Sequence, residues 1–115
     1  LMQRFCILRH DFPFWHWDFL LEAGNHAECW RLLREPCGNE PIAAEHLPPH
    51  RLLYLEYEGP VSNDRGTVRR FAWGTYRIIE PGPHLSIELT GLNWAQQACL
   101  TDTRDGRLFW SFDAK

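Results

Sequence analysis

Short runs of alternating apolar and polar residues, separated by turn signals, occur along the whole chain. Alternation with a period of two is typical of β-strands that bury one face. A long apolar pattern with the helical period of 3.6 residues does not occur. The pattern therefore predicts strands over residues 4–9, 15–23, 27–33, 51–58, 67–73, 75–79, 85–89, 94–100 and 108–112.

The segments between these runs contain turn-forming residues. Gly24-Asn25 predicts a tight hairpin between two of the strands, and Asp105-Gly106 predicts another. Residues 34–49 include several prolines and predict a loop, with at most one short helical turn around 43–45. Gly74 predicts a bend that separates strand 67–73 from strand 75–79.

Many short strands with little helix predict an all-β fold. We expect a single compact antiparallel β-barrel of about seven or eight short strands over residues 1–115. Hydrophobic residues make up 44% of the chain, which suffices for one core and argues against disorder. The absence of a long apolar run or a leader predicts a cytoplasmic monomer with no membrane partner.

The segment His10 to Glu22 contains the clearest candidate chemistry. On a regular strand, His16 and Asp18 project from one face, and His10 is close enough in sequence to fold over them. Two imidazoles and a carboxylate make a plausible open site for a divalent metal, although the same spacing also suits a surface hydrogen-bonded pair. Trp15 and Trp17 alternate with these residues, so the pattern predicts that both face the core.

A second pair, His50 and Tyr54, is spaced so that both side chains share the face of a strand. An imidazole and a phenol can both donate to a phosphate oxygen. The pair is also compatible with a loop histidine and a core tyrosine. The formal net charge of −3 disfavours non-specific binding to nucleic acid, but eleven of the twelve basic residues are arginines, which suit local phosphate recognition.

The chain resembles the 3′-phosphoesterase domain of bacterial DNA ligase D and its stand-alone relatives. The resemblance rests on an ordered set of motifs along nearly the whole chain, of the form His-Asp, His-x-Asp-Phe-x-Leu-Glu, Trp with a basic residue four further on, His-x3-Tyr, acidic-Gly, Gly-Thr-Val and Gly-Thr-Tyr. They correspond to His10-Asp11, His16, Asp18-Phe19, Leu21-Glu22, Trp30, Arg34, His50, Tyr54, Glu58-Gly59, Gly66-Thr67-Val68 and Gly74-Thr75-Tyr76.

The resemblance implies a barrel with a divalent metal of the manganese type, held by His10, His16 and Asp18. It implies that His50 and Tyr54 contact phosphate. The implied activity removes a 3′-terminal ribonucleotide or a 3′-phosphate and leaves a 3′-OH. The implied partners are 3′ ends of DNA, on a primer-template or nicked duplex, and a ligase or polymerase.

Asp11 and Glu22 are expected to support this site from outside it. Asp11 would orient a ligand histidine or cap a turn, and Glu22 would hold a basic side chain or remain an exposed carboxylate.

The sequence departs from the family at two positions where the family has arginine. The first lies two residues after the metal aspartate and is Leu20 in this chain, and the second lies eight residues before the later histidine and is Ile42. Three interpretations follow: an active phosphoesterase in which Arg34, Arg65, Arg69 or Arg70 supplies the missing charge; a weak or inactive metal-binding barrel that binds a nucleic-acid end or a protein partner; or a phosphatase or diesterase whose substrate is not DNA.

Overall fold

A computed structural model describes residues 2–115 of the chain. Its strands and its single turn of 3-10 helix follow one another as β1 (Gln3–His10), β2 (His16–Ala23), β3 (His26–Leu32), β4 (Ile42–His50), η1 (Leu52–Leu55), β5 (Gly59–Pro60), β6 (Thr67–Glu80), β7 (Ser86–Thr90), β8 (Ala95–Asp102) and β9 (Leu108–Ala114). No helix among the described residues is long and apolar enough to cross a membrane.

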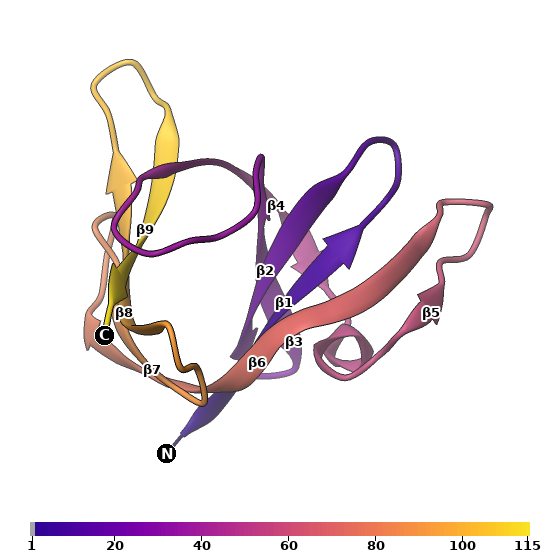
Figure 1. The fold of residues 1–115 in the computed structure, drawn as a ribbon, viewed down its shortest axis with the longest axis horizontal. Helices are drawn as coiled ribbons and strands as arrows, with labels where there is room; N and C mark the ends of the chain where they lie inside the picture. Colours follow the sequence, from indigo (N-terminus) through magenta and orange to yellow (C-terminus); the bar gives the residue numbers. More distant parts are fainter. Residues whose placement is uncertain (1) are drawn as a thin grey trace.

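Eight of the strands form a closed antiparallel barrel, as the alternation predicts (Figure 1). Their order around the barrel is β1-β2-β3-β4-β9-β8-β7-β6, and β6 pairs with β1 to close the ring. The short strand β5 extends the sheet at β6. Along the β1–β6 seam the register shifts between Ile7 and Leu8, which places a β-bulge in the wall of the barrel.

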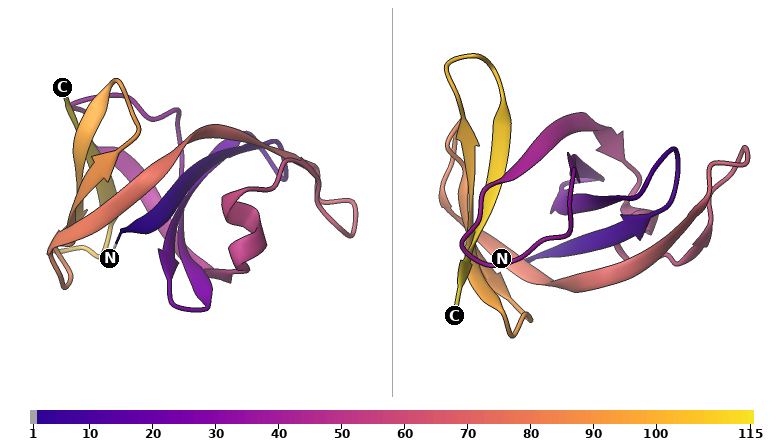
Figure 2. Two further views of the ribbon diagram at one scale, coloured as in Figure 1. Left: turned by 90° about the horizontal axis from the view of Figure 1, so that it is seen from below. Right: turned by 45° about the horizontal axis from the view of Figure 1, so that its top comes forward.

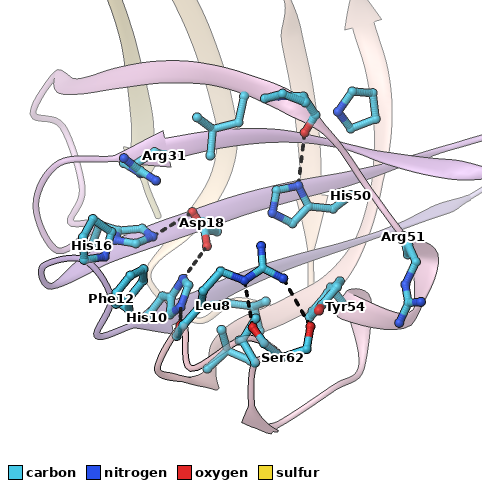
Figure 3. Close-up of a pocket in the computed structure, with 17 residues that line it drawn as sticks. Leu8, His10, Phe12, His16, Asp18, Arg31, His50, Arg51, Tyr54 and Ser62 are labelled. Carbon is cyan, nitrogen blue, oxygen red and sulfur yellow. Dashed lines mark hydrogen bonds and ion pairs between the residues drawn. The ribbon is translucent and has the colours of Figure 1, made fainter.

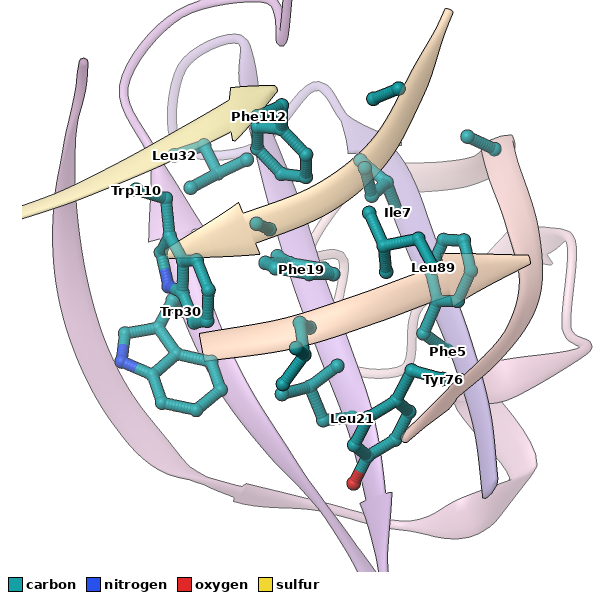
Figure 4. Close-up of a cluster of buried hydrophobic side chains, with 14 of the residues drawn as sticks. Phe5, Ile7, Phe19, Leu21, Trp30, Leu32, Tyr76, Leu89, Trp110 and Phe112 are labelled. Carbon is teal, nitrogen blue, oxygen red and sulfur yellow. The ribbon is translucent and has the colours of Figure 1, made fainter. Parts of the chain in front are cut away.

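The barrel strands bury side chains on two opposite faces. Inside the barrel, every one of the eight strands contributes to an aromatic-rich core, including Phe19, Trp30 and Trp110 (Figure 4). On the outer face of β1, β2, β3 and β6, a smaller cluster includes Leu8, Leu20 and Leu55. Because successive residues of a strand point to opposite faces, one set of strands serves both clusters.

The outer cluster is covered by the segment that follows β4. Its helical turn η1 contacts β1, β2 and β3 and lies outside the barrel in Figures 1 and 2. Residues 51–58 had been expected to form a strand, and this expectation is wrong. Backbone bonds from Tyr54 N to Arg51 O and from Glu56 N to Leu53 O close the helical turn. The turn places Leu52 and Leu55 on the outer cluster, so packing overrides the alternation.

The predicted loop at 34–49 is also only partly right, because β4 begins at Ile42. Its first residues, Ile42 to Ala44, pair with β9, and from Ala44 onward the strand pairs with β3. After Ala44 the pairing with β9 ends, so the rest of β4 has a partner only in β3. An open edge tolerates Pro48 and Pro49, which lack an N–H donor.

The predicted interruption at Gly74 does not occur, because β6 is continuous from Thr67 to Glu80. A Cβ atom at Gly74 would collide with the carbonyl oxygen of Thr90 and touch the ring of Phe5. The glycine therefore allows a close approach between strands rather than a break in the strand.

Candidate metal centre

The three predicted metal ligands meet where β1 and β2 join. His10 ends β1 and lies opposite His16, the first residue of β2, while Asp18 lies opposite Leu8. All three side chains project from the outer face of the barrel. Their ligand atoms lie within 4.8 Å of one another. The period-two pattern predicted the shared face of His16 and Asp18, and the pairing of β1 with β2 places His10 beside them.

The buried carboxylate of Asp18 lies between the two imidazoles (Figure 3). Its Oδ2 is 3.5 Å from His10 Nδ1, and its Oδ1 is 3.2 Å from His16 Nε2. Burial opposes ionisation of Asp18, but the two imidazoles outweigh it and lower the pKa of the carboxyl to about 2. The carboxylate in turn raises the pKa of His10 above its usual 6.5. The cluster therefore contains an ionised carboxylate at neutral pH.

Backbone carbonyls fix the orientation of both imidazoles. His16 Nδ1 is 2.9 Å from the carbonyl oxygen of Phe14, and His10 Nε2 is 2.8 Å from that of Arg65. A carbonyl can only accept, so these two nitrogens carry the protons and donate. In the neutral imidazoles, His16 Nε2 and His10 Nδ1 then present lone pairs toward Asp18, and only a protonated ring donates to the carboxylate and lowers its pKa. A metal-binding histidine is commonly held in this way by its other nitrogen.

A buried oxygen without a hydrogen-bond donor indicates what the cluster can bind. Asp18 is 4% exposed, and within residues 2–115 its buried Oδ1 has no well-oriented hydrogen-bond donor. The lone pair of His16 Nε2 faces this oxygen, and two such atoms repel unless a proton or cation lies between them. Two imidazole nitrogens and a carboxylate oxygen fit a divalent transition metal with open coordination positions. The residues present are therefore suited to a divalent cation.

The cluster lies at the base of a pocket of about 620 Å³. His50 at the end of β4 and Tyr54 in η1 line the same pocket, with their ring centroids 5.9 Å apart. The two residues come together across a helical turn, not along one strand as the spacing predicted. His50 Nδ1 is 3.1 Å from the carbonyl oxygen of Pro48, to which it donates, so its Nε2 carries the lone pair.

Of the four arginines expected to supply the missing charge, Arg65 lines this pocket, whereas Arg34, Arg69 and Arg70 are not among its lining residues in the described part of the chain. Arg34 pairs with Glu40 at 2.9 Å and donates to the carbonyl of Pro41. Arg69 is exposed on β6. Arg70 lies over the ring of Trp73, with its guanidinium carbon 4.1 Å from the ring centroid.

Two further arginines, Arg31 and Arg51, line the pocket together with Arg65. Arg31 lies directly across from Asp18 on β3. Within residues 2–115 its buried Nε has no hydrogen-bond partner, and its Nη1 is 4.0 Å from a carboxylate oxygen of Glu45. The hairpin turn at Gly24-Asn25 sets this pairing, so the predicted turn already contained the signal that places Arg31 beside Asp18.

Leu20 lies away from the pocket, although it shares a strand face with Asp18. Its side chain is fully buried in the outer cluster, across from Cys6 on β1 and Cys29 on β3. The position where the resembling family has an arginine is thus filled by hydrophobic packing in this chain.

Among the described residues, neither Asp11 nor Glu22 hydrogen-bonds an imidazole of the cluster, and only Asp11 lies next to it in the chain. Asp11 Oδ1 accepts a 2.7 Å hydrogen bond from the backbone N–H of Thr67, which ties the β1–β2 loop to the start of β6. Glu22 lies at the far end of β2, where its carboxylate accepts hydrogen bonds from the backbone N–H and the guanidinium of Arg4.

Comparison with known proteins gives one partial relative. A segment of 62 residues, 52% of this chain, is 29% identical to the multifunctional non-homologous end joining protein LigD of Pseudomonas aeruginosa. The match covers 7% of the length of that protein. No protein-family model matches the chain. The similarity supports a relationship to a part of LigD.

Proposed function

We propose that this chain is a divalent-metal-dependent phosphoesterase that acts on 3′ ends of DNA. It removes a 3′-terminal ribonucleotide or a 3′-phosphate and leaves a 3′-OH. The observation that carries the proposal is the cluster of His10, His16 and Asp18 at the base of a pocket lined by arginines. The relationship to a part of LigD, whose name refers to end joining, supports the choice of DNA ends.

The pocket residues have separate tasks in this proposal. His10, His16 and Asp18 would hold the metal, for which the resemblance favours manganese. A divalent ion bound there supplies a Lewis acid for a phosphoryl oxygen and lowers the pKa of a bound water. The pocket-lining guanidinium of Arg31 offers two parallel donors to the remaining phosphate oxygens.

His50 and Tyr54 act from the opposite wall of the pocket. The proton on His50 Nδ1 is held by Pro48, so a protonated His50 donates from Nε2 to the leaving oxygen. The Tyr54 hydroxyl donates to a phosphate oxygen. Both contacts neutralise charge that develops as the phosphate ester breaks.

A test uses a duplex whose primer strand ends in a single 3′-ribonucleotide or a 3′-phosphate, with manganese added. We expect conversion to a 3′-OH end by the parent protein and loss of conversion in Asp18→Asn. The matched control is His26→Ala, since His26 lies on β3, pairs with Glu28 and is outside the pocket. Failure of the parent to bind manganese, or equal turnover by Asp18→Asn, would refute the proposal.

A second candidate function is favoured by Leu20. Because no arginine follows Asp18 on β2, the second candidate is a barrel that binds metal and a nucleic-acid end or a protein partner without turnover. The same experiment separates the two functions. Manganese binding that depends on Asp18, combined with no product from either substrate, supports the binding module.

A further inference from the structure

Three large aromatic side chains are exposed in the loop between β1 and β2. Phe12 is 40% exposed, Phe14 is 50% exposed and Trp15 is 55% exposed. The sequence pattern predicted that Trp15 faces the core, and the structure shows that this is wrong. Exposing adjacent large rings leaves apolar area in water, and such exposed patches usually mark a binding site.

The loop that carries these rings borders the pocket, because Phe12 and Pro13 line it, while Phe14 and Trp15 follow just outside the lining. The loop connects His10 to His16, and the Phe14 ring lies edge-on to the imidazole of His16, with 5.7 Å between the centroids. A ligand that occupies the pocket and extends past its rim would therefore meet the aromatic loop.

Guanidinium groups lie over two of the exposed rings. The guanidinium carbon of Arg9 is 4.5 Å from the ring centroid of Trp15, and that of Arg31 is 5.5 Å from the centroid of Phe14. Each pair combines a flat apolar surface with a positive charge. This combination matches a strand of nucleic acid, in which flat bases alternate with negative phosphates.

The loop is held at both ends before any ligand binds. The carbonyl oxygen of Phe14 accepts the hydrogen bond from His16 Nδ1, and Asp11 Oδ1 accepts that from the Thr67 N–H. Anchoring of this kind reduces the entropy lost when the rings receive a ligand. The exposed rings thus belong to a loop whose backbone is fixed by the metal cluster and by β6.

We propose that Phe14 and Trp15 form a stacking surface for unpaired bases at the 3′ end of a nucleic-acid strand whose terminal phosphate enters the pocket. The inference rests on the proposed function, from which it takes that the 3′ end of the strand enters the pocket. It adds a preference for single-stranded or frayed 3′ ends over fully paired ends, because a base must leave its own stack to lie on the protein.

Binding of a fluorescent single-stranded oligonucleotide with a 3′-phosphate tests the inference. Fluorescence anisotropy is measured at low salt in the presence of EDTA, so that binding is separated from hydrolysis. We expect Trp15→Ala to weaken binding roughly tenfold, since stacking on one aromatic ring is commonly worth this much. Phe14→Ala serves as a second variant and should weaken binding in the same direction.

The chain provides a matched control in Trp73 on β6. Trp73 is 51% exposed and lies under Arg70, but it does not line the pocket. Trp73→Ala should bind the oligonucleotide within about twofold of the parent, because that ring lies outside the proposed path of the strand. Urea unfolding of each variant verifies that the fold is intact.

A second probe removes the bases and keeps the charge. An abasic strand of equal length and equal phosphate number should bind the parent about as weakly as the normal strand binds Trp15→Ala. Trp15→Ala should then bind the abasic strand with the same affinity as the parent, as expected when base and ring interact directly.

Two results would overturn the stacking surface: binding by Trp15→Ala and Phe14→Ala within twofold of the parent, or equal binding of the abasic and normal strands. Tighter binding of a blunt duplex than of the single strand would also contradict it. Failure of the proposed function is recognised separately, as absence of product with manganese while ring-dependent strand binding persists.

Discussion

Replacing Leu20 with arginine tests whether this position can accommodate the arginine that the phosphoesterase family has there. Leu20 is fully buried in the outer cluster with Leu8, Cys29 and Leu55. Loss of the buried leucine surface costs about 2 kcal/mol. An unpaired guanidinium in the same place raises the total to about 3–5 kcal/mol.

Urea unfolding measures this effect as a lower transition midpoint at an unchanged slope. A loss of about 3–5 kcal/mol is a large part of the total stability of a small domain, so Leu20→Arg should be partly unfolded or easily unfolded. Leu33→Arg is the matched control, because Leu33 is exposed and should change stability by less than about 0.5 kcal/mol.

The reasoning would be refuted if Leu20→Arg kept the stability of the parent. In that case the arginine would extend along the strand face into the pocket, and inorganic phosphate should then bind more tightly than it binds the parent.

Other predictions concern the pocket and its supports. Arg31→Ala should lower turnover of a 3′-phosphorylated oligonucleotide by about 10²- to 10³-fold, whereas Arg34→Ala should leave it unchanged; steady-state kinetics compares them. Gly66 has φ +77°, and an added Cβ would collide with Asp11 and Phe12, so Gly66→Ala should lower the free energy of unfolding by about 1–3 kcal/mol in a urea titration. Hydrogen bonds from Arg4 lower the pKa of Glu22 below 4.5, so its stabilisation is present above that pH and is lost as the pH falls through the lowered pKa. Glu22→Gln should therefore be less stable than the parent near neutral pH, by under about 1 kcal/mol, and equally stable at a pH below the lowered pKa of Glu22.

The strands with clear alternation could be predicted from sequence, because one buried face requires a period of two. The two segments that differ, 42–50 and 51–58, depend on tertiary structure. Pro48 and Pro49 read as loop residues, but the missing partner on one side of β4 makes them acceptable in a strand. The apolar residues of 52–55 pack on the outer cluster, which no local pattern reveals.

The candidate site also combines residues whose place local sequence predicts with residues whose place depends on the tertiary structure. The period of two predicted the shared face of His16 and Asp18, and the pairing of β1 with β2 places His10 beside them. Arg31 was missed as a pocket residue, although the turn at Gly24-Asn25 determines its place opposite Asp18. Arg51 and Arg65 reach the pocket from segments whose positions depend on closure of the barrel and on the covering segment.

The location of the ligands on a single hairpin has a consequence for the order of folding. Barrel closure pairs Gln3 with Tyr76, a contact that needs a large loop to close and therefore forms slowly. The β1–β2 hairpin needs only contacts between neighbours in sequence, which form within microseconds. A divalent cation would thus meet its three ligands before the barrel is complete, and its binding would favour the nucleus from which the remaining strands assemble.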